Sequence, residues 1–314
     1  MPWQDVFAQP PEPGCALAIG NFDGVHRGHQ EVLRALAGAA GAGSHTPVVL
    51  VPDPHPLAVL GQPPRLLTPL PERGRLLARH GAATLLRLPF DAKVAAMEPE
   101  QFVGRVLLDL VRPAEVVVGF NFSYGRAARG GVESLRAQLA AAGVPLMVVG
   151  PTAALGDTVS SSRVRAALEA GNLDAVRTML GREFAVRGTV RPGAQRGRTL
   201  GFPTANVHCA PEQAMPRPGV YAVRCLVQGR IMGGAASLGP RPTFDEQEPL
   251  LEVHLLDYAG DLYGQELLVA FTHRLRGIER YASAEALRAQ MAQDCVDART
   301  VLGGVAADFG DMLG

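Results

Sequence analysis

The sequence predicts a parallel α/β domain, followed by a small antiparallel β-barrel that ends with a C-terminal helix. Three observations carry this prediction. In the first half, short apolar segments alternate with helical segments, which is typical of strands joined by crossover helices. In the second half, β-like segments follow one another without intervening helices, which indicates antiparallel pairing. The 314 residues are sufficient for two domains with separate cores.

The first half supplies the parallel sheet. We expect strands at residues 15–19, 48–51, 84–88, 115–119 and 145–149, and helices at 29–40, 71–80, 99–110 and 132–142. Continuous apolar runs such as Val116, Val117 and Val118 suit a sheet that is buried on both faces. Because such sheets bind ligands beyond the carboxyl ends of their strands, a site is expected in the loops after the first, second and fourth strands.

The second half supplies the barrel. We expect strands at residues 184–190, 219–227, 231–238, 250–256 and 266–275. The last helix begins near Ser283, a favourable N-cap, with Glu285 in the first turn, and runs to about residue 302. The pattern changes within residues 171–186, after two short helices, so we predict domains at 1–181 and 182–314.

The charge composition excludes several classes of protein. The chain has 30 basic and 30 acidic residues, and Lys93 is its only lysine. A Walker-type loop and a Schiff-base enzyme both need a lysine in a specific setting that Lys93 lacks. A neutral total argues against a broad nucleic-acid-binding surface. Any bound phosphate must therefore be held by arginine, histidine, backbone N–H groups or a metal ion.

The remaining composition predicts a cytoplasmic protein that does not enter a membrane. The first residues show no basic stretch followed by an apolar one, so we expect no signal peptide. No apolar run approaches the roughly 18 residues of a membrane span. The four cysteines show no paired spacing and suit isolated buried thiols. The sequence does not indicate an oligomeric state.

The first expected strand runs into a glycine-rich loop, Gly-Asn-Phe-Asp-Gly-Val-His-Arg-Gly-His, at residues 20–29. Such a turn lets backbone approach a ligand, and the following helix start offers free N–H groups for a phosphate. His26 and His29 can donate hydrogen bonds to phosphate oxygens. A tight turn with two solvated histidines is the simpler alternative. A metal site made of both histidines and Asp23 is weaker, because it lacks a clear fourth ligand.

This ten-residue string resembles the HxGH signature of the nucleotidyltransferase superfamily, in the version found in bacterial bifunctional riboflavin kinase/FAD synthetases. The resemblance implies a Rossmann-like nucleotidyltransferase domain followed by a riboflavin kinase barrel, and it extends over about residues 14–302. It implies adenylyl-transfer roles for His26 and His29, and nucleotide contacts for Gly20, Phe22 and Gly24.

Two further loops of the first half fit this resemblance. Asp53 lies in a Pro-rich turn after the second strand, where the resemblance implies a flavin contact, although Pro52 stands where the family usually has Phe. Residues 119–125 resemble the family's G-x-[DN]-F-x-[FY]-G loop, which makes Asn121 a nucleotide-binding candidate. The aromatic residues Phe122 and Tyr124 can equally be packing residues.

The segment Val-Ser-Ser-Ser-Arg-Val-Arg, at residues 159–165, opens a helix. Serines at a helix start are commonly only caps, but arginines in the same turn can grip a phosphate. The string is similar to the family's ISSTRIR signature. The resemblance implies nucleotide contacts for Ser161, Ser162 and Arg163. Arg165, two residues further on, points to another face of the helix.

In the second half, residues 196–206 form a basic loop that runs into a strand and resembles the PTAN motif of riboflavin kinases. Thr204 and Asn206, two apart in a strand, point to one face and can share a Mg²⁺–phosphate site; a plain turn and hairpin is the alternative. Gln195 stands where the family commonly has Lys. The resemblance implies nucleotide contacts for three loop residues, namely Gly197, Thr199 and Gly201.

Glu252 lies in an apolar strand, where a carboxylate is costly to bury unless it is used. An outward, solvated side chain is the alternative, since Glu252 alternates with Val253. The resemblance implies that Glu252 is the catalytic base of the kinase. The segment 239–244 matches the family's GxRPTF, and Ser237 replaces a usual Asn.

The C-terminal region resembles the family's R-x-x-E-x-[FY] segment. The resemblance implies flavin contacts for Arg276, Glu279 and Tyr281, with Asp294 on the helix that approaches the flavin. Two nearby residues, His254 and Asp257, are expected to be structural.

The expected activity is therefore flavin cofactor biosynthesis at two sites. The resemblance implies phosphorylation of riboflavin to FMN and adenylylation of FMN to FAD, with ATP as co-substrate and Mg²⁺ as cofactor. We expect small-molecule substrates only, with no nucleic acid and no membrane partner. Three alternatives remain: another adenylyl- or cytidylyltransferase on the same fold, a kinase whose first domain has lost its chemistry, and a flavin-binding or regulatory module.

Overall fold

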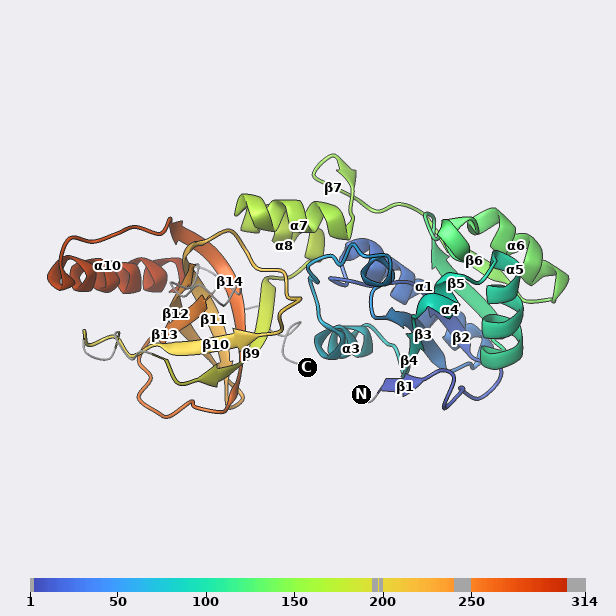
Figure 1. Cartoon of the computed structure of the whole chain (residues 1–314), viewed down its shortest axis with the longest axis horizontal. Coiled ribbons are helices and arrows are strands. Elements are labelled where there is room, and N and C mark those ends of the chain that lie inside the picture. Colours follow the sequence, from blue (N-terminus) through green and yellow to red (C-terminus); the bar gives the residue numbers. More distant parts are fainter. Residues whose placement is uncertain (1–2, 194–196, 198–199, 240–249, 304–314) are drawn as a thin grey trace. The chain divides into compact units, whose positions relative to one another are not determined.

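The computed structural model describes residues 3–193, 197, 200–239 and 250–303. The chain forms two compact units, Met1–Ser161 and Ser162–Gly314 (Figure 1). The first compact unit ends at residue 161, whereas the sequence changes from alternating strands and helices to consecutive strands near residue 181. The boundary at 181/182 therefore stays a prediction about functional domains.

The first unit contains a six-stranded parallel sheet with the strand order β1-β4-β3-β2-β5-β6. Its strands are β1 (Trp3–Asp5), β2 (Ala16–Ile19), β3 (Pro47–Asp53), β4 (Thr84–Pro89), β5 (Glu115–Gly119) and β6 (Leu146–Val149). The five expected strands are confirmed, and β1 is an additional short edge strand. Strands β2 and β5 are neighbours although they are not consecutive, so the order reverses there, which is where open α/β sheets bind ligands.

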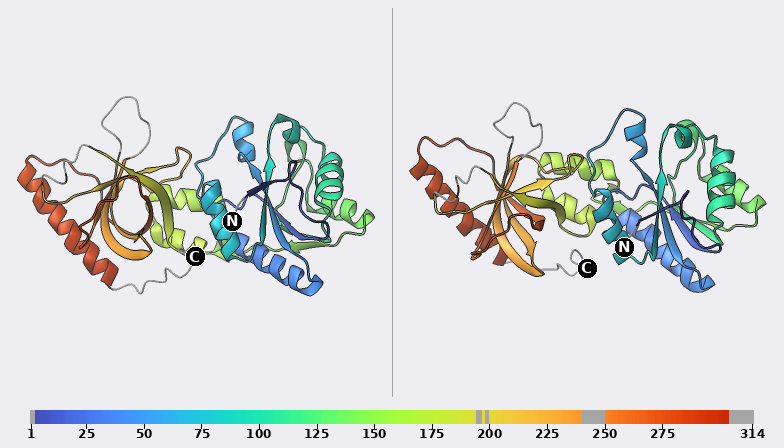
Figure 2. Two further views of the ribbon diagram at one scale, coloured as in Figure 1. Left: turned by 90° about the horizontal axis from the view of Figure 1, so that it is seen from below. Right: turned by 60° about the horizontal axis from the view of Figure 1, so that its bottom comes forward.

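Helices cover both faces of this sheet (Figure 2). They are α1 (Arg27–Gly43), α2 (Pro56–Val59), α3 (Leu70–Arg79), α4 (Ala92–Ala95), α5 (Pro99–Gln101), η1 (Phe102–Val111), η2 (Arg126–Ala128) and α6 (Val132–Ala141). Alternate residues of β2 enter opposite cores: Leu17 packs with η1 and α6, whereas Ala18 packs with α1 and α3. The expected burial of the sheet on both faces is thereby confirmed.

One helix differs in type from the expectation. The expected α-helix over 99–110 is a short α-helical turn, α5, that continues as the π-helix η1. The apolar residues Phe102, Val103, Val106 and Leu107 all remain buried. The wider turn keeps the apolar face on the sheet while its backbone bonds shift to i→i+5.

The first unit ends with the hairpin of β7 (Ala153–Ala154) and β8 (Asp157–Thr158) and the start of α7 (Ser161–Ala170). The second unit continues with α8 (Leu173–Leu180), which contacts barrel strands through an apolar face. Helix α8 therefore packs with the barrel.

The second unit is a closed antiparallel barrel with the order β10-β13-β12-β11-β14-β9, closed because β9 pairs with β10. Its strands are β9 (Phe184–Arg191), β10 (Ala205–Cys209), β11 (Gly219–Val227), β12 (Arg230–Gly239), β13 (Leu250–Leu255) and β14 (Glu266–Arg276). The helix α10 (Ala284–Gly303) packs through Ala298 on Ala222, outside the barrel. The expected barrel and terminal helix are confirmed.

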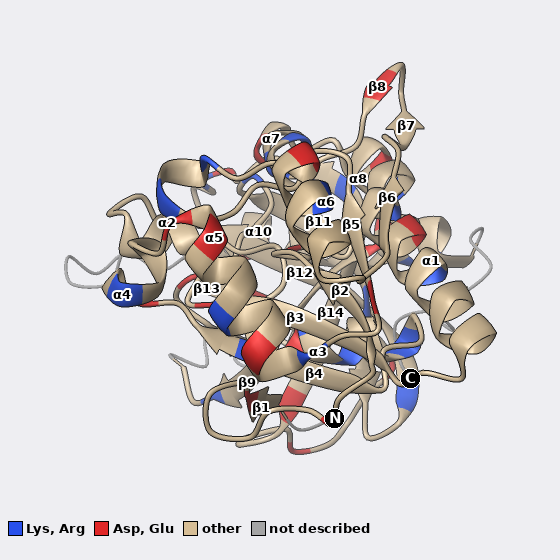
Figure 3. Ribbon diagram, turned by 90° about the vertical axis from the view of Figure 1, so that its right-hand side faces the viewer, with Lys and Arg blue, Asp and Glu red and all other residues tan. Residues whose placement is uncertain are grey.

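Acidic and basic residues are interspersed over both helices and strands of the described parts (Figure 3). No described helix is long and apolar enough to cross a membrane.

Candidate active sites

The loop between β2 and α1 has an unusual backbone. Phe22 and Val25 have φ values of 50° and 40°, and Gly24 between them has 84°. Side chains rarely adopt this left-handed conformation, so it persists only where the surroundings over-determine it. Phe22 and Val25 are 2% and 0% exposed, which anchors the loop in the core. The loop thus presents the following residues in one fixed conformation.

His26 and His29 lie together at the start of α1. The ring of His26 caps the helix by accepting a hydrogen bond from the His29 backbone N–H at 3.3 Å. The two rings stack with centroids 3.6 Å apart. His26 is 6% exposed, so the alternative of two solvated histidines is wrong for His26. Both imidazoles therefore lie where the N–H groups and the dipole of a long helix favour a phosphate.

Gly28 has a steric reason to be glycine. A Cβ at this position would lie 3.2 Å from His26 Cε1 and 3.3 Å from Nδ1, which is tighter than usual contacts. The glycine of the HxGH string therefore makes room for the imidazole stack. Gly20 has the same kind of role, because its Cβ would lie 3.1 Å from the Phe22 ring.

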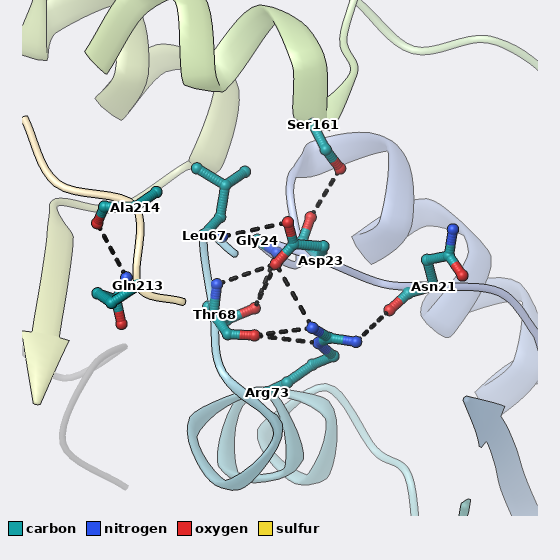
Figure 4. A network of polar contacts seen from close by, with 9 residues as sticks. All are labelled: Asn21, Asp23, Gly24, Leu67, Thr68, Arg73, Ser161, Gln213 and Ala214. Atoms are coloured by element: carbon teal, nitrogen blue, oxygen red, sulfur yellow. Dashed lines mark hydrogen bonds and ion pairs between the residues drawn. The ribbon is translucent and has the colours of Figure 1, made fainter. Parts of the chain in front are cut away.

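The carboxylate of Asp23 is turned into the protein (Figure 4). It accepts hydrogen bonds from the backbone N–H of Leu67 at 3.1 Å and of Thr68 at 2.9 Å, and lies 3.6 Å from the guanidinium of Arg73. Within the described residues there is no cluster of three His, Cys, Asp or Glu side chains able to hold a metal. The alternative metal site of Asp23 with both histidines is therefore not formed.

Ser161, the first residue of α7, belongs to the same arrangement. Its hydroxyl donates a hydrogen bond of 2.8 Å to the backbone carbonyl of Asp23. Ser162 is exposed and Arg163 half-buried in the first turn of α7. The start of α7 and the glycine-rich loop are thus joined through Ser161.

The other expected loops follow neighbouring strands of the sheet. Asn121 is exposed just after β5, beside the loop that follows β2. Asp53 ends β3, where it pairs with Arg87 at 3.4 Å. Pro52 remains in the strand, paired with Leu88, so this departure from the family pattern does not shorten β3.

Two aromatic residues of the β5 loop, Phe122 and Tyr124, are packing residues. Phe122 packs against the core, and Tyr124 is buried in it with its hydroxyl bonded to Ser134 and Gln138. Burial raises the pKa of Tyr124.

In the barrel, the cross-strand register places five polar residues and one valine in a single row. From strand to strand the row reads Arg191, Asn206, Glu252, Ser237, Val220 and Arg276. Directly opposed residues of antiparallel strands point to the same face and lie about 5 Å apart. The row therefore gathers residues that are far apart in the sequence on one face.

This face is the outside of the barrel, beside α10. The neighbours of Glu252 in β13, Leu251 and Val253, are 0% and 1% exposed and point inward. Ala222 and Ala235, two residues from Val220 and Ser237, pack towards α10 on the outer face. Glu252 is half-buried there. It is directed outward, as the alternative supposed, but it is only partly solvated.

Asn206 is 8% exposed although it is polar. A side chain at Gly193 would collide with its carboxamide, so this glycine makes room for it. Thr204 is half-buried and precedes β10, which begins at Ala205. The expectation that Thr204 lies within the strand is therefore wrong by one residue, since the ladder begins after the Pro203 turn.

The described part of the basic loop is shaped around Thr204. A Cβ at Gly197 would lie 3.1 Å from the Thr204 hydroxyl and collide with the Phe202 carbonyl. Gly201 has a φ of 87°, which favours glycine. Residues 194–196, 198–199 and 240–249, which include Gln195, Thr199 and most of the GxRPTF segment, lie outside the described residues.

A cavity of about 630 Å³ opens beside the start of β10. It is lined by Thr204, Pro203, Val253 and residues 258–263, among others. The expected structural role of His254 fits its contacts, because its ring bonds the Pro203 carbonyl at 2.8 Å. Asp257 is held by two hydrogen bonds from Arg299 of α10.

A second cavity, of about 640 Å³, lies at the other end of the row. It is lined by Ser237, Arg276, Glu279 and Tyr281, among others. Asp294 of α10 binds Arg276 through two hydrogen bonds of 2.7 Å. These bonds raise the pKa of Arg276. The structure thus brings all three flavin candidates to one cavity.

The Glu279 carboxylate, the Tyr281 ring and the Arg276 guanidinium of this cavity are mutually ordered. The Tyr281 hydroxyl donates to Glu279 at 3.2 Å, and the Arg276 guanidinium lies 5.8 Å from the Tyr281 ring centroid. Burial raises the pKa of Tyr281, so its hydroxyl stays protonated at neutral pH.

Sequence reasoning missed Thr68, Arg73 and Arg191. Thr68 and Arg73 are 45 and 50 positions from Asp23, and no local pattern links them. Arg191 could have been found, because pairing the expected strand at 184–190 with the strand of the PTAN motif places it opposite Asn206.

The two units correspond to two known domain types. The FAD synthetase family model matches residues 8–163, and the riboflavin kinase family model matches residues 180–302. Fold and sites therefore define a two-domain enzyme of flavin metabolism.

Curated relatives identify the family over nearly the full length. The bifunctional riboflavin kinase/FMN adenylyltransferase of Escherichia coli K12 is 38% identical, covering 95% of this chain and 96% of that protein. Those of Listeria monocytogenes and Bacillus subtilis are 35% and 33% identical, covering 90% and 88% of this chain and 91% and 89% of the relatives. The chain belongs to the family of bifunctional riboflavin kinases/FMN adenylyltransferases.

A solved structure shares the whole fold. It is described as a macrolide-efflux protein from Streptococcus pneumoniae, superimposes with a TM-score of 0.85, and is 28% identical, covering 94% of this chain and 97% of that chain.

Proposed function

We propose that this chain makes FAD from riboflavin in two ATP-dependent steps, each at its own site. The barrel phosphorylates riboflavin to FMN, and the parallel α/β unit then adenylylates FMN to FAD with release of pyrophosphate. The observation that carries this assignment is the match of the two family models, in order, to the two halves of the chain.

In the kinase site, we assign Glu252 as the general base. Its carboxylate accepts the proton of the ribityl 5′-hydroxyl as that oxygen attacks the γ-phosphorus of ATP. The new O–P bond forms while the bond to the β-phosphate oxygen breaks, and ADP leaves with the electron pair. The half-buried outer face beside Asn206 supports this role, because the carboxylate is reachable yet partly shielded.

The residues around Glu252 fit a magnesium ion. Thr204 and Asn206 offer neutral oxygen atoms, and Mg²⁺ prefers oxygen ligands and phosphate partners. When bound, Mg²⁺ would neutralise charge on the transferred phosphate. We assign Thr204 and Asn206 to hold it, with Gly193 leaving the space that the Asn206 side chain occupies.

Arg191 extends the same site. It is exposed at the end of β9 and opposite Asn206, so its Cα is about 10 Å from that of Glu252 at ordinary strand spacing. An extended arginine reaches most of that distance. We assign its guanidinium to the ATP phosphates, since Arg binds phosphate through a two-pronged contact.

The two cavities of the barrel unit suit the two kinase substrates. We assign the flavin to the cavity of Arg276, Glu279 and Tyr281, where Asp294 orients the guanidinium. The nucleotide is assigned to the cavity at Thr204, together with Gly197, Gly201 and Thr199 of the basic loop. Both volumes lie in the usual range for ligand pockets.

In the adenylyltransferase site, no protein nucleophile is needed. A phosphate oxygen of FMN attacks the α-phosphorus of ATP in line, the bond to the β-phosphate oxygen breaks, and pyrophosphate leaves. We assign His26, His29 and Arg163 to stabilise the developing charge. The remaining contacts are assigned to Gly20, Phe22, Gly24, Asn121, Ser161 and Ser162 for the nucleotide, and to Asp53 for the flavin.

We further propose that the enzyme acts on small molecules in the cytoplasm, without nucleic acid or membrane partners. The balanced charge of 30 basic and 30 acidic residues supports this, because phosphate-binding groups are confined to a few loops.

The direct test incubates the protein with riboflavin, ATP and Mg²⁺ and separates the flavins by chromatography. FMN should form first and FAD should follow. FMN without FAD, under oxidising and reducing conditions alike, would contradict the adenylyltransferase assignment. No conversion, with tight flavin binding, would favour a binding module.

A further inference from the structure

The glycine-rich loop is held from behind by a buried polar network. Asp23, Thr68 and Arg73 are 1%, 4% and 2% exposed, and Figure 4 shows their polar atoms directed at one another. The hydrogen bonds of this network join the loop before the two histidines to the segment before α3 and to α3 itself. We propose that these three residues are positioning residues, which set the place of the two histidines in the adenylyltransferase site; this inference rests on the proposed function of that site.

Arg73 and Thr68 hold the loop at three residues, Asn21, Asp23 and Gly24. Arg73, from α3, donates through Nη1 to the Asn21 carbonyl at 2.9 Å and lies 3.6 Å from the Asp23 carboxylate. The Thr68 hydroxyl accepts the Gly24 N–H at 2.9 Å. The contacts therefore hold the chain on either side of Phe22, the first left-handed residue, and at Gly24, the second.

The network is itself rigid. Arg73 donates from Nε and Nη2 to the Thr68 carbonyl at 3.2 and 2.9 Å. Asp23 in turn accepts the Leu67 and Thr68 N–H groups. These bonds thus connect the Arg73 guanidinium, the Asp23 carboxylate and the segment before α3, so that the position of each depends on the other two.

Stability alone is a weak reason for this arrangement. A buried ion pair commonly contributes little more than apolar residues of similar volume, because both charges lose their hydration. Directional bonds add to the anchoring by Phe22 and Val25, because each one fixes the orientation of a particular peptide group in a conformation that is otherwise disfavoured. His26 lies two residues after Gly24, so a displacement of the loop would move both imidazole rings.

The network also reaches the second motif of this unit. Ser161 donates to the backbone carbonyl of Asp23. Asp23 therefore contacts the buried network through its carboxylate and the start of α7 through its backbone. Displacing Asp23 would therefore move the imidazoles and the serine together.

Thr68→Val tests the inference with little change in volume. Valine removes the acceptor of the Gly24 N–H but keeps the backbone N–H that binds Asp23. The kcat of FAD formation from FMN should fall about 10- to 100-fold, while the KM for ATP changes less than about 3-fold, because misplaced groups lose their effect in the transition state. Thr68→Ser retains the hydroxyl and should restore kcat to within about 3-fold of the native value.

Arg75→Gln is the matched control, since Arg75 lies on the same helix and forms a part-buried ion pair with Glu72, outside the Asp23 network. It should leave all rates unchanged. Riboflavin phosphorylation by the same samples should be unaffected in every variant. A histidine Cε1–H NMR spectrum without ligand should show the His26 and His29 resonances shifted in Thr68→Val, because their stacked rings at 3.6 Å report small displacements.

If Thr68→Val unfolds the first unit, Arg73→Lys replaces it. Lysine retains the charge opposite Asp23 but cannot also reach the Asn21 carbonyl, so kcat should again fall with KM nearly unchanged. A native kcat per folded molecule in either variant, with unshifted histidine resonances, would overturn the inference. A native chain that makes no FAD would instead refute the proposed function, and this inference with it.

Discussion

The pair of Arg276 and Asp294 gives the most quantitative prediction. Asp294→Asn keeps the shape of the side chain, but its amide nitrogen faces an Arg276 N–H, so one of the two bonds of 2.7 Å becomes a clash of donors. A hydrogen bond to a charged group contributes about 1.5–3 kcal/mol. The side chains are 19% and 7% exposed, so little water can replace the lost bond. Because Arg276 keeps its other bond to residue 294 and its bond to the Gly277 carbonyl at 3.0 Å, we expect a loss of about 1.5–2 kcal/mol.

This loss should be visible in two measurements. The barrel should be destabilised by about 1.5–2 kcal/mol in urea unfolding. The KM for riboflavin should rise about 10-fold, since about 1.4 kcal/mol corresponds to a factor of ten and the freed guanidinium no longer faces the flavin cavity. The pH should not matter near neutrality, because an arginine is charged there in the native chain and in the variant alike.

Asp297→Asn is the control, on the same helix but bonded only to Gln293 among the described residues. It should change neither quantity beyond about 0.5 kcal/mol. Equal effects of the two substitutions, or an unchanged riboflavin KM in Asp294→Asn, would refute the role of this pair in flavin binding.

Three further predictions concern other parts of the chain. Gly28→Ala places a methyl group 3.2 Å from an imidazole carbon of the stacked pair and should lower kcat for FAD formation about 10-fold, with riboflavin phosphorylation as the unaffected internal control. Arg191→Gln should raise the kinase KM for ATP about 5- to 10-fold, whereas Arg187→Gln, on the same face of the same strand, should not; equal KM values would exclude the phosphate role. The pKa of Asp257 is lowered by hydrogen bonds from Arg299, so Arg299→Gln should reduce the Tm slightly at neutral pH, and the difference should vanish as the pH falls below about 4. A difference that persists at low pH would contradict this ion pair.

The architecture was largely predictable because each half has one dominant pattern of apolar segments: strands alternating with helices in the first half, and consecutive strands in the second. Apolar runs such as 116–118 could only suit a sheet buried on both faces, and both cores contain them. The short edge strand at Trp3–Asp5 was missed because three half-buried residues carry no pattern. The π-helical turn at 102–111 was missed because its apolar spacing fits an α-helix equally well.

The sites were predictable only where their chemistry is local. His26, Gly28 and His29 lie within four positions, so their string alone indicates a phosphate site. The partners of Asp23 lie more than 40 positions away, and their meeting depends on the packing of α3. Glu252 remained ambiguous for a similar reason: its neighbour Asn206 is set by strand register, which the sequence of one strand does not fix.

Two independent active sites on one chain are the basis of the proposed function. The most direct test supplies Glu252→Gln and His29→Ala, each with ATP and Mg²⁺, first with riboflavin and then with FMN. We predict that Glu252→Gln forms no FMN from riboflavin yet converts added FMN to FAD, and that His29→Ala accumulates FMN without FAD. Loss of both reactions in either folded variant would contradict the two-site assignment.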